Sequence, residues 1–420
     1  MSACAALTEP VDPMRPRLEV AEIFRSHGEQ YRTEHSVAPE QAKAMRDIQA
    51  CRTAALGGHL DVCDEGCGYQ RISYNSCRNR HCPKCQGLQS ARWLETRFDK
   101  ILPTPYFHMV FTIPHELIGI TLQNRKTLYD ILFRAAAQAL LQLAQEWERL
   151  RAHIGFTAIL HTWNQELQFH PHLHIVATGG GLDRSQTRWI QARNDFLVPV
   201  RTLSKKFRGT FIDLLREAFD TKGLRFHSSS RHLLNPGAFE RLMKKLSRIK
   251  WVVYAKQPFG GAEQVFRYLG LYTHKVAISN HRLVEMDNGQ VTFLARDNSN
   301  PGRKRSVTLP AGEFIRRFLL HILPSGFVKI RHYGLMAPRN ATTKLDIARK
   351  LLALSAPDRY NAVSPRIQAA TWMDLLFHLT QIDLAVCPVC GANLIRHPLT
   401  SFEHPASSPA RSGPILQDSS

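Results

Sequence analysis

Hydrophobic residues recur with two different periods along the chain, which predicts both strands and helices. Strand-like runs span Tyr106–Ile113, Ile154–Trp163 and Leu167–Thr178, and the short polar link between the last two predicts a hairpin. Residues 118–150 and 200–250 have apolar side chains at helical spacing. The pattern therefore predicts an α+β fold with antiparallel strand pairs and flanking helices.

Turn and cap residues mark where several of these predicted elements begin and end. Asp287-Asn288-Gly289 is a hairpin signal. Asn235-Pro236 predicts a capped helix start with proline at the first helical position. The run Gly179-Gly180-Gly181 is expected to end the strand before it. Arg303-Lys304-Arg305 is expected to lie in a loop.

The net charge of the chain indicates what kind of partner it binds. The chain has 420 residues, with 55 Lys and Arg against 35 Asp and Glu, a net charge of +20. Residues 201–250 hold 13 basic and 4 acidic side chains, and residues 301–340 hold 8 and one. Solvated helix faces are one explanation; contact with phosphate groups is the one we favour, which predicts a nucleic-acid partner rather than a membrane. Arg303, Lys304 and Arg305 are candidate DNA contacts.

No apolar run is long enough to span a membrane, and the first residues lack the pattern of a secretory signal. We therefore expect a cytoplasmic protein. In such a reducing compartment, clustered cysteines predict metal binding rather than disulfides.

Six of the nine cysteines fall between Cys51 and Cys85. Two short knuckles there, C-x3-C and C-x2-C, can together surround one tetrahedral zinc ion. The predicted ligands of this structural zinc are Cys63, Cys67, Cys82 and Cys85. Four candidate ligands remain: Cys51, His59, Cys77 and His81. Either they form a second zinc site, or they are free cysteines and surface histidines. Nearby arginines, including Arg78 and Arg80, predict contact with nucleic acid.

A further pair, Cys387 and Cys390, has no second cysteine pair nearby in the sequence. It is either half of a metal site, which His397 and His404 can complete, or a pair of structural thiols.

The run Phe169–Val176 carries a His-x-His pattern. Side chains alternate along a strand, so His172 and His174 face the same way and can chelate a divalent cation. His161 on the preceding strand is the best third ligand, because antiparallel pairing brings it opposite residues 170–172. Pro171 interrupts the ladder, so this strand is expected to be bulged or at an edge. The alternative is that these histidines are structural.

Tyr268 and Tyr272 are spaced by one helical turn and therefore share a helix face. Such pairs usually pack at the edge of a core. Beside a metal-chelating pair and basic residues, a tyrosine can instead attack a phosphodiester, if a metal ion spreads the developing charge.

These features, in this order, resemble the HUH-type rolling-circle transposases of the insertion sequence 91 family. The similarity covers residues 40–390 and rests on five strings: SCRNRHCPKCQ (76–86), FHMVFTIPHEL (107–117), HPHLHIVATGGGL (170–182), YLGLYTHKVAISNHRL (268–283) and FIRRFLLHILPSGFVKIRHYG (314–334). One departure is the C-x3-C spacing at Cys63, where C-x2-C is more usual.

The resemblance implies a small zinc-binding module followed by an HUH nuclease domain. It also implies Mg²⁺ or Mn²⁺ at His172 and His174, and Tyr268 and Tyr272 as nucleophiles. The expected reaction is nicking and strand transfer of single-stranded DNA at transposon ends and target through a 5′-phosphotyrosine. The expected segments are an N-terminal extension (1–40), the zinc-binding domain (41–100), the catalytic domain (101–300), a basic C-terminal part (301–385) and the cysteine knuckle with a disordered tail (386–420).

Three other functions fit parts of this pattern. A rolling-circle replication initiator or a relaxase shares the chemistry. A non-enzymatic zinc-finger DNA-binding regulator would use the histidines and tyrosines structurally. A zinc hydrolase would use His172 and His174 without forming a covalent DNA adduct.

Overall fold

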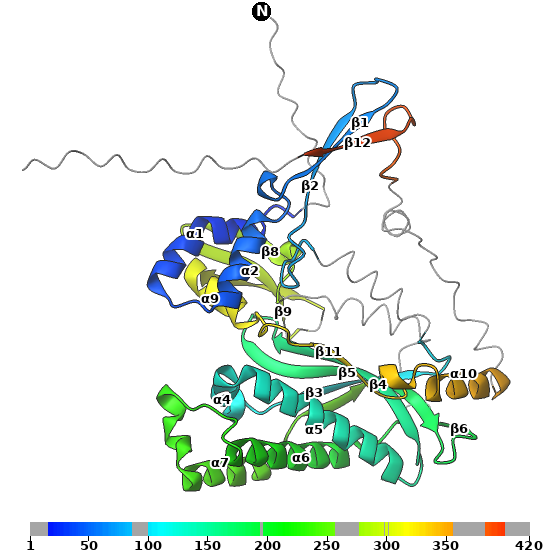
Figure 1. Cartoon of the computed structure of the whole chain (residues 1–420). Helices are drawn as coiled ribbons and strands as arrows, with labels where there is room; N and C mark the ends of the chain where they lie inside the picture. Colours follow the sequence, from blue (N-terminus) through cyan, green and yellow to red (C-terminus); the bar gives the residue numbers. More distant parts are fainter. Residues whose placement is uncertain are drawn as a thin grey trace, which may run out of the picture.

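A computed structural model describes residues 16–85, 100–193, 196–256, 277–297, 299–300, 302–355 and 383–399. Its elements form three parts stacked along one axis (Figure 1). A six-stranded sheet with helices lies at one end, a smaller helix and sheet layer in the middle, and a three-stranded sheet at the other end. The predicted α+β class with antiparallel sheets is confirmed.

The large sheet has the predicted hairpin at its centre. Its strand order is β11 (Ile330–Gly334), β4 (His153–Trp163), β5 (Phe169–Leu182), β3 (Tyr106–Thr112), β7 (Val253–Lys256), with β6 (Trp189–Gln191) also paired to β5. All these pairs are antiparallel.

Strand β5 continues through the three glycines, so the prediction that they end it is wrong. A side chain there would collide with neighbouring backbone: a Cβ at Gly179 would lie 2.6 Å from the Pro105 carbonyl oxygen, and one at Gly181 would lie 2.3 Å from that of His153. The glycines therefore allow neighbouring chain segments to approach this end of β5 closely.

Helices cover one face of this sheet. Alternate side chains such as Met109, Phe111 and Leu173 point into a core shared with helices α5 and α6. The single helix predicted over residues 118–150 is two, because Asn124 ends α4 and begins α5. The helices of this layer are α4 (Ile118–Gln123), α5 (Arg125–Glu146), α6 (Val200–Asp220) and α7 (Pro236–Arg248). The predicted cap at Asn235 is present, since its Oδ1 accepts from the Ala238 amide at 3.1 Å.

The opposite face of the sheet has two zones. At one end, Tyr106, Ile159 and Val176 pack in a cluster with residues of α10 (Lys344–Ser355). Toward the other end of the same face lie His161, His172 and His174, which alternate with the residues of the helix-covered core. This face therefore carries the histidines away from the main core.

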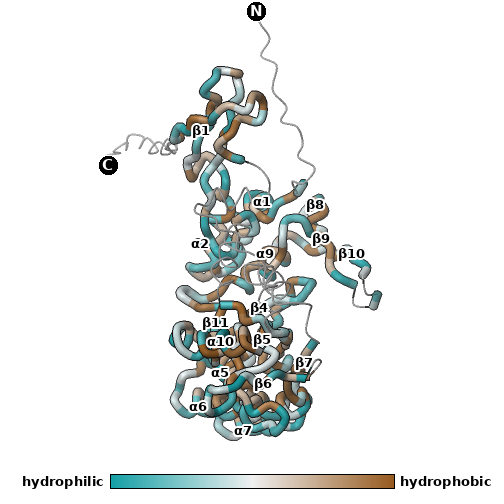
Figure 2. The backbone as a smooth tube through the Cα atoms, turned by 90° about the vertical axis from the view of Figure 1, so that its right-hand side faces the viewer, coloured by the Kyte–Doolittle hydropathy of each residue, from teal (hydrophilic) through white to brown (hydrophobic). Residues whose placement is uncertain are grey.

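The middle part joins segments from both ends of the chain. Helices α1 (Val20–Glu34), α2 (Pro39–Ala50) and α9 (Ala311–Leu320) pack in one cluster with the sheet β10 (Lys304–Pro310), β9 (Gln290–Arg296), β8 (Leu283–Asp287). The predicted turn is present, with Asn288 and Gly289 at positive φ. The loop predicted at Arg303-Lys304-Arg305 is wrong in part, because β10 begins at Lys304. In Figure 2 this strand lies on a hairpin that projects sideways.

The third part is a small sheet in the order β12 (Leu394–Leu399), β1 (Gly58–Cys63), β2 (Gln70–Tyr74). Residues 394–399 lie in the segment expected to hold the cysteine knuckle and a disordered tail, and they form a strand. Short 3-10 turns complete the described elements: Ala54–Leu56, His115–Leu117, Ser228–Leu234, Asn280–Arg282 and Pro338–Asn340. Among the helices that the structure describes, none is both long and apolar enough to cross a membrane.

Candidate functional site

Three histidines converge on the sheet face opposite helices α5 and α6. His161 on β4 lies directly opposite His172 on β5, and His174 follows two residues later. Their candidate ligand atoms lie within 4.8 Å of one another. The register passes through a bulge between His161 and Trp163, where Pro171 interrupts the ladder, so the bulge predicted there is present. Strand β5 is not at the edge of the sheet, because it lies between β4 and β3.

Hydrogen bonds orient two of these rings toward each other. Nδ1 of His172 donates to the carbonyl oxygen of His170 at 2.7 Å, so Nε2 of His172 keeps its lone pair. Nε2 of His172 lies 3.1 Å from Nε2 of His174. Adjacent ligands of an octahedral ion with bonds of 2.0–2.1 Å lie about 2.9 Å apart. The two nitrogens are therefore spaced for a single divalent cation.

His108 on β3 completes this arrangement, and no role was predicted for it. Its Nε2 lies 2.9 Å from Nδ1 of His174, and the two rings are nearly parallel. When Nδ1 of His174 donates this hydrogen bond, its Nε2 keeps a lone pair that can bind a metal ion. Strand alternation could have identified His108, since Phe107 and Met109 on either side of it face the core.

Burial favours the uncharged form of two imidazoles at this site, those of His172 and His108. It lowers the pKa of His172 to about 4. Burial, assisted by the charge of Lys256, also lowers the pKa of His108 to about 4. The ring of His161 stacks on that of Trp163 at 4.5 Å. Metal ions bind the neutral imidazole, so the low pKa of His172 is compatible with a role as a metal ligand at neutral pH.

The predicted nucleophiles Tyr268 and Tyr272, and the helix expected around them, lie outside the described residues. The described chain stops at Lys256, which pairs with His108 across β7 and β3, and resumes at Ala277.

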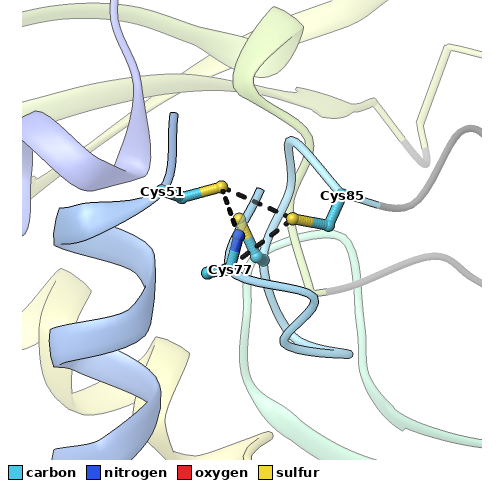
Figure 3. Close-up of side chains that lie close together, drawn as sticks. Cys51, Cys77 and Cys85 are labelled. Atoms are coloured by element: carbon cyan, nitrogen blue, oxygen red, sulfur yellow. Dashed lines mark hydrogen bonds between the residues drawn. The ribbon is translucent and has the colours of Figure 1, made fainter. Parts of the chain in front are cut away.

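The eight cysteines that the structure describes form two sets of four, which differ from the predicted grouping. One set is Cys51, Cys77, Cys82 and Cys85, whose sulfur atoms all lie within 4.8 Å of one another. Figure 3 shows Cys51 at the end of α2 beside Cys77 and Cys85. Sγ of Cys85 lies 3.4 Å from that of Cys51 and 3.6 Å from that of Cys77. Hydrogen bonding, above all with Cys77, lowers the pKa of the Cys51 thiol to about 7.

The other set is Cys63, Cys67, Cys387 and Cys390. Strand β1 leads Cys63 to the far end of the small sheet, away from Cys82, and its antiparallel partner β12 follows directly after the Cys387 knuckle. None of the predicted histidines that the structure describes joins a set. His59 lies on β1 opposite Ser73 of β2, and Nε2 of His81 accepts from the Leu323 amide at 3.1 Å. His397 lies on β12 opposite Leu60, and His404 lies outside the described residues.

The predicted DNA-contacting residues have different surroundings. Arg80 donates to the carbonyl oxygens of Phe327 and Pro324 at 2.6 and 2.9 Å, which joins the cysteine segment to the chain before β11. Arg305 forms an ion pair with Glu166. Arg303, Lys304 and Arg78 are exposed, and Arg78 has a positive φ.

Comparison with known proteins identifies the family. Residues 155–344 match the family model described as "Putative transposase", and residues 23–113 match "Transposase zinc-binding domain". The chain is 47% identical over 373 residues to "Putative transposase y4qJ" of Sinorhizobium fredii, covering 89% of this chain and 92% of that protein. It is 25% identical over 369 residues to the transposase for insertion sequence element IS801 of Pseudomonas savastanoi pv. phaseolicola, covering 84% and 83%. No solved structure matches. The chain belongs to the transposases of the insertion sequence 91 family.

Proposed function

We propose that this transposase nicks and rejoins single-stranded DNA by HUH nuclease chemistry. The observation that carries the proposal is the convergence of His161, His172 and His174 on one sheet face, with His108 beside His174. These imidazoles would hold Mg²⁺ or Mn²⁺, which when bound would polarise the scissile phosphate.

The nucleophile of this proposal is the hydroxyl oxygen of Tyr268 or Tyr272. It bonds to the phosphorus and gives up its proton, while the bond from phosphorus to the 3′ oxygen breaks and that oxygen is protonated. The products are a 5′-phosphotyrosine and a free 3′-OH. Because the phosphotyrosine keeps the energy of the broken bond, a 3′-OH can reverse the step and complete strand transfer. Two tyrosines allow two successive cleavages.

The DNA substrate fits the distribution of charge. Basic side chains outnumber acidic ones in residues 201–250 and 301–340, and exposed Arg303 and Lys304 are available to phosphates. The set Cys51, Cys77, Cys82 and Cys85 lies within the matched zinc-binding domain and fits a structural Zn²⁺ that would fix Arg78 and Arg80 in place.

The test is adduct formation with labelled single-stranded DNA from a transposon end, in the presence of Mg²⁺ or Mn²⁺. We expect a covalent protein–DNA adduct with the unaltered protein. Each single change Tyr268→Phe or Tyr272→Phe should keep some cleavage and lose most transposition. The double change should abolish the adduct while DNA binding and zinc content remain.

Tyr254→Phe is the matched control, since Tyr254 is an exposed tyrosine on β7; it should form the adduct normally. The pair His172→Ala and His174→Ala should also lose nicking but keep DNA binding. An adduct formed by the double tyrosine variant would place the nucleophile elsewhere and disprove the assignment.

A further inference from the structure

We propose that Cys63, Cys67, Cys387 and Cys390 bind a second structural Zn²⁺, which fastens residues 383–399 to the amino-terminal part of the chain. The matched zinc-binding domain ends at residue 113, so two of these four thiols lie far outside it. The proposal does not depend on the nuclease mechanism.

The sulfur positions fit a tetrahedral zinc site. Sγ of Cys63 lies 3.4 Å from Sγ of Cys390, and Sγ of Cys67 lies 3.6 Å from Sγ of Cys387. Four thiolates bound to zinc at about 2.3 Å lie about 3.8 Å apart, whereas a disulfide needs about 2.05 Å. The sulfur atoms of each knuckle thus lie close to those of the other. Zinc binding would displace the four thiol protons.

The backbone around both knuckles is shaped to hold the thiols. Gly66 between Cys63 and Cys67 has a φ of 68°, and Gly391 directly after Cys390 has a φ of 78°, a conformation that favours glycine. The amide of Gly391 donates to the Cys387 carbonyl oxygen at 3.0 Å, which closes the second knuckle. Both tight turns are therefore present before any ion is considered.

Strand pairing brings the two knuckles together. Strands β1 and β12 pair over six residues, from Gly58 opposite Leu399 to Cys63 opposite Leu394. Asp61 on β1 is buried, and it accepts hydrogen bonds from Arg71 at 2.8 Å and Arg396 at 2.7 Å. A buried carboxylate that loses its ion-pair partners destabilises the fold. Because Arg71 lies on β2 and Arg396 on β12, the ion pairs of Asp61 favour the observed register of all three strands.

Apolar packing does not explain the stability of this sheet. The described residues of β1, β2 and β12 belong to none of the three hydrophobic clusters. Ile72, Ile395 and Val389 are 57%, 51% and 69% exposed, and the sheet stands at the end of the molecule opposite α7 (Figures 1 and 2). A small module without a core needs a metal ion or disulfide to fold stably. The four convergent thiols supply the metal site.

Zinc content of the full chain tests the proposal. The unaltered protein should bind two zinc ions. Changing Cys387 and Cys390 to Ser should remove one, and changing Cys63 and Cys67 to Ser should also remove one. The quadruple variant should again lose only one, because all four residues serve the same ion. Loss of two ions from the quadruple variant, or of none from the Cys387 and Cys390 variant, would overturn the proposal.

A second measurement needs no substitution and so cannot be confused by misfolding. The zinc-loaded full chain is treated with increasing chelator and N-ethylmaleimide, and the alkylated cysteines are identified by mass spectrometry. We expect Cys63, Cys67, Cys387 and Cys390 to become reactive together. Alkylation of Cys387 and Cys390 in the zinc-loaded protein, or joint release of Cys63 and Cys67 with Cys82 and Cys85, would contradict the site.

Discussion

Nε2 of His108 lies 2.9 Å from Nδ1 of His174, so a histidine of β3 orients a candidate metal ligand on the neighbouring strand β5. A hydrogen bond to the ring nitrogen that does not bind the metal fixes the tautomer and direction of the other nitrogen. We therefore expect His108 to act as a positioning residue rather than as a ligand.

We predict that His108→Ala lowers the affinity for Mn²⁺ by about 10–100-fold, the usual effect of removing such a partner. Titration followed by the electron paramagnetic resonance of free Mn²⁺ measures this directly. Zinc content should not change. His115→Ala, at an exposed histidine just after β3, is the control and should bind Mn²⁺ normally. Equal affinities in the two variants would mean that His108 does not act on the site.

Stability should fall as the pH drops, in part through His321. This ring is buried between the Thr162 hydroxyl and the Leu167 carbonyl oxygen, and burial lowers its pKa to about 3. In the unfolded chain a histidine gains its proton near pH 6.5. Between about pH 6.5 and pH 3 the unfolded state therefore binds more protons, and this group contributes a loss of stability with falling pH.

We predict that His321→Gln reduces the difference in unfolding free energy between pH 7.5 and pH 5.5 by about 1 kcal/mol. Urea unfolding at the two pH values provides the measurement. The exposed residue His281 is the control, and His281→Gln should keep the pH dependence of the unaltered protein. An unchanged dependence in His321→Gln would show that His321 is not the titrating group.

The exposed cations at the start of β10 should contact DNA phosphates. We predict that changing Arg303 and Lys304 to Gln weakens binding to all sequences alike. It should flatten the dependence of log K on log salt by about one unit for each lost contact. Arg305→Gln should have a smaller effect, because Arg305 is paired with Glu166. The charge-matched control changes exposed Arg32 and Arg46 to Gln. If both double variants give the same slope, β10 lies away from the DNA.

Arg80 should act on stability rather than on DNA affinity. Both guanidinium nitrogens that donate to Pro324 and Phe327 are committed to backbone carbonyls, and burial lowers the pKa of Arg80. We predict that Arg80→Ala lowers the unfolding free energy by about 1–3 kcal/mol and leaves the salt dependence of DNA binding unchanged. Thermal and urea unfolding, with filter binding at several salt concentrations, measure the two effects. A flatter salt dependence would instead support a DNA contact.

The sequence predicted the parts of the structure that depend on local pattern. The alternation in β4 and β5, with a short polar link between them, was sufficient to place His161 opposite His172. The turn at Asn288-Gly289 and the cap at Asn235 follow from single residues with strong backbone preferences. These features need no knowledge of distant segments.

The cysteine grouping could not be found in that way. Proximity along the chain favoured joining Cys63 and Cys67 to Cys82 and Cys85, but β1 pairs on one side with β12, more than three hundred residues away. Periodicity within β1 is compatible with many pairings. The three glycines were likewise expected to end the strand. Their actual role depends on the close approach of His153 and Pro105 to β5, which is a tertiary contact that the local sequence does not reveal.

The two cysteine sets differ in when they can form during synthesis. Cys51 and Cys85 are 34 residues apart, whereas Cys63 and Cys390 are separated by 327. At a translation rate of 5–20 residues per second, the second separation takes roughly 20–60 seconds to synthesise. The first set can assemble soon after it leaves the ribosome, but β1 waits for β12 until the residues of the large sheet have been made. During that interval Cys387 and Cys390 have not yet been made. The growing chain therefore exposes the thiols of Cys63 and Cys67 to oxidants and to competing metal ions.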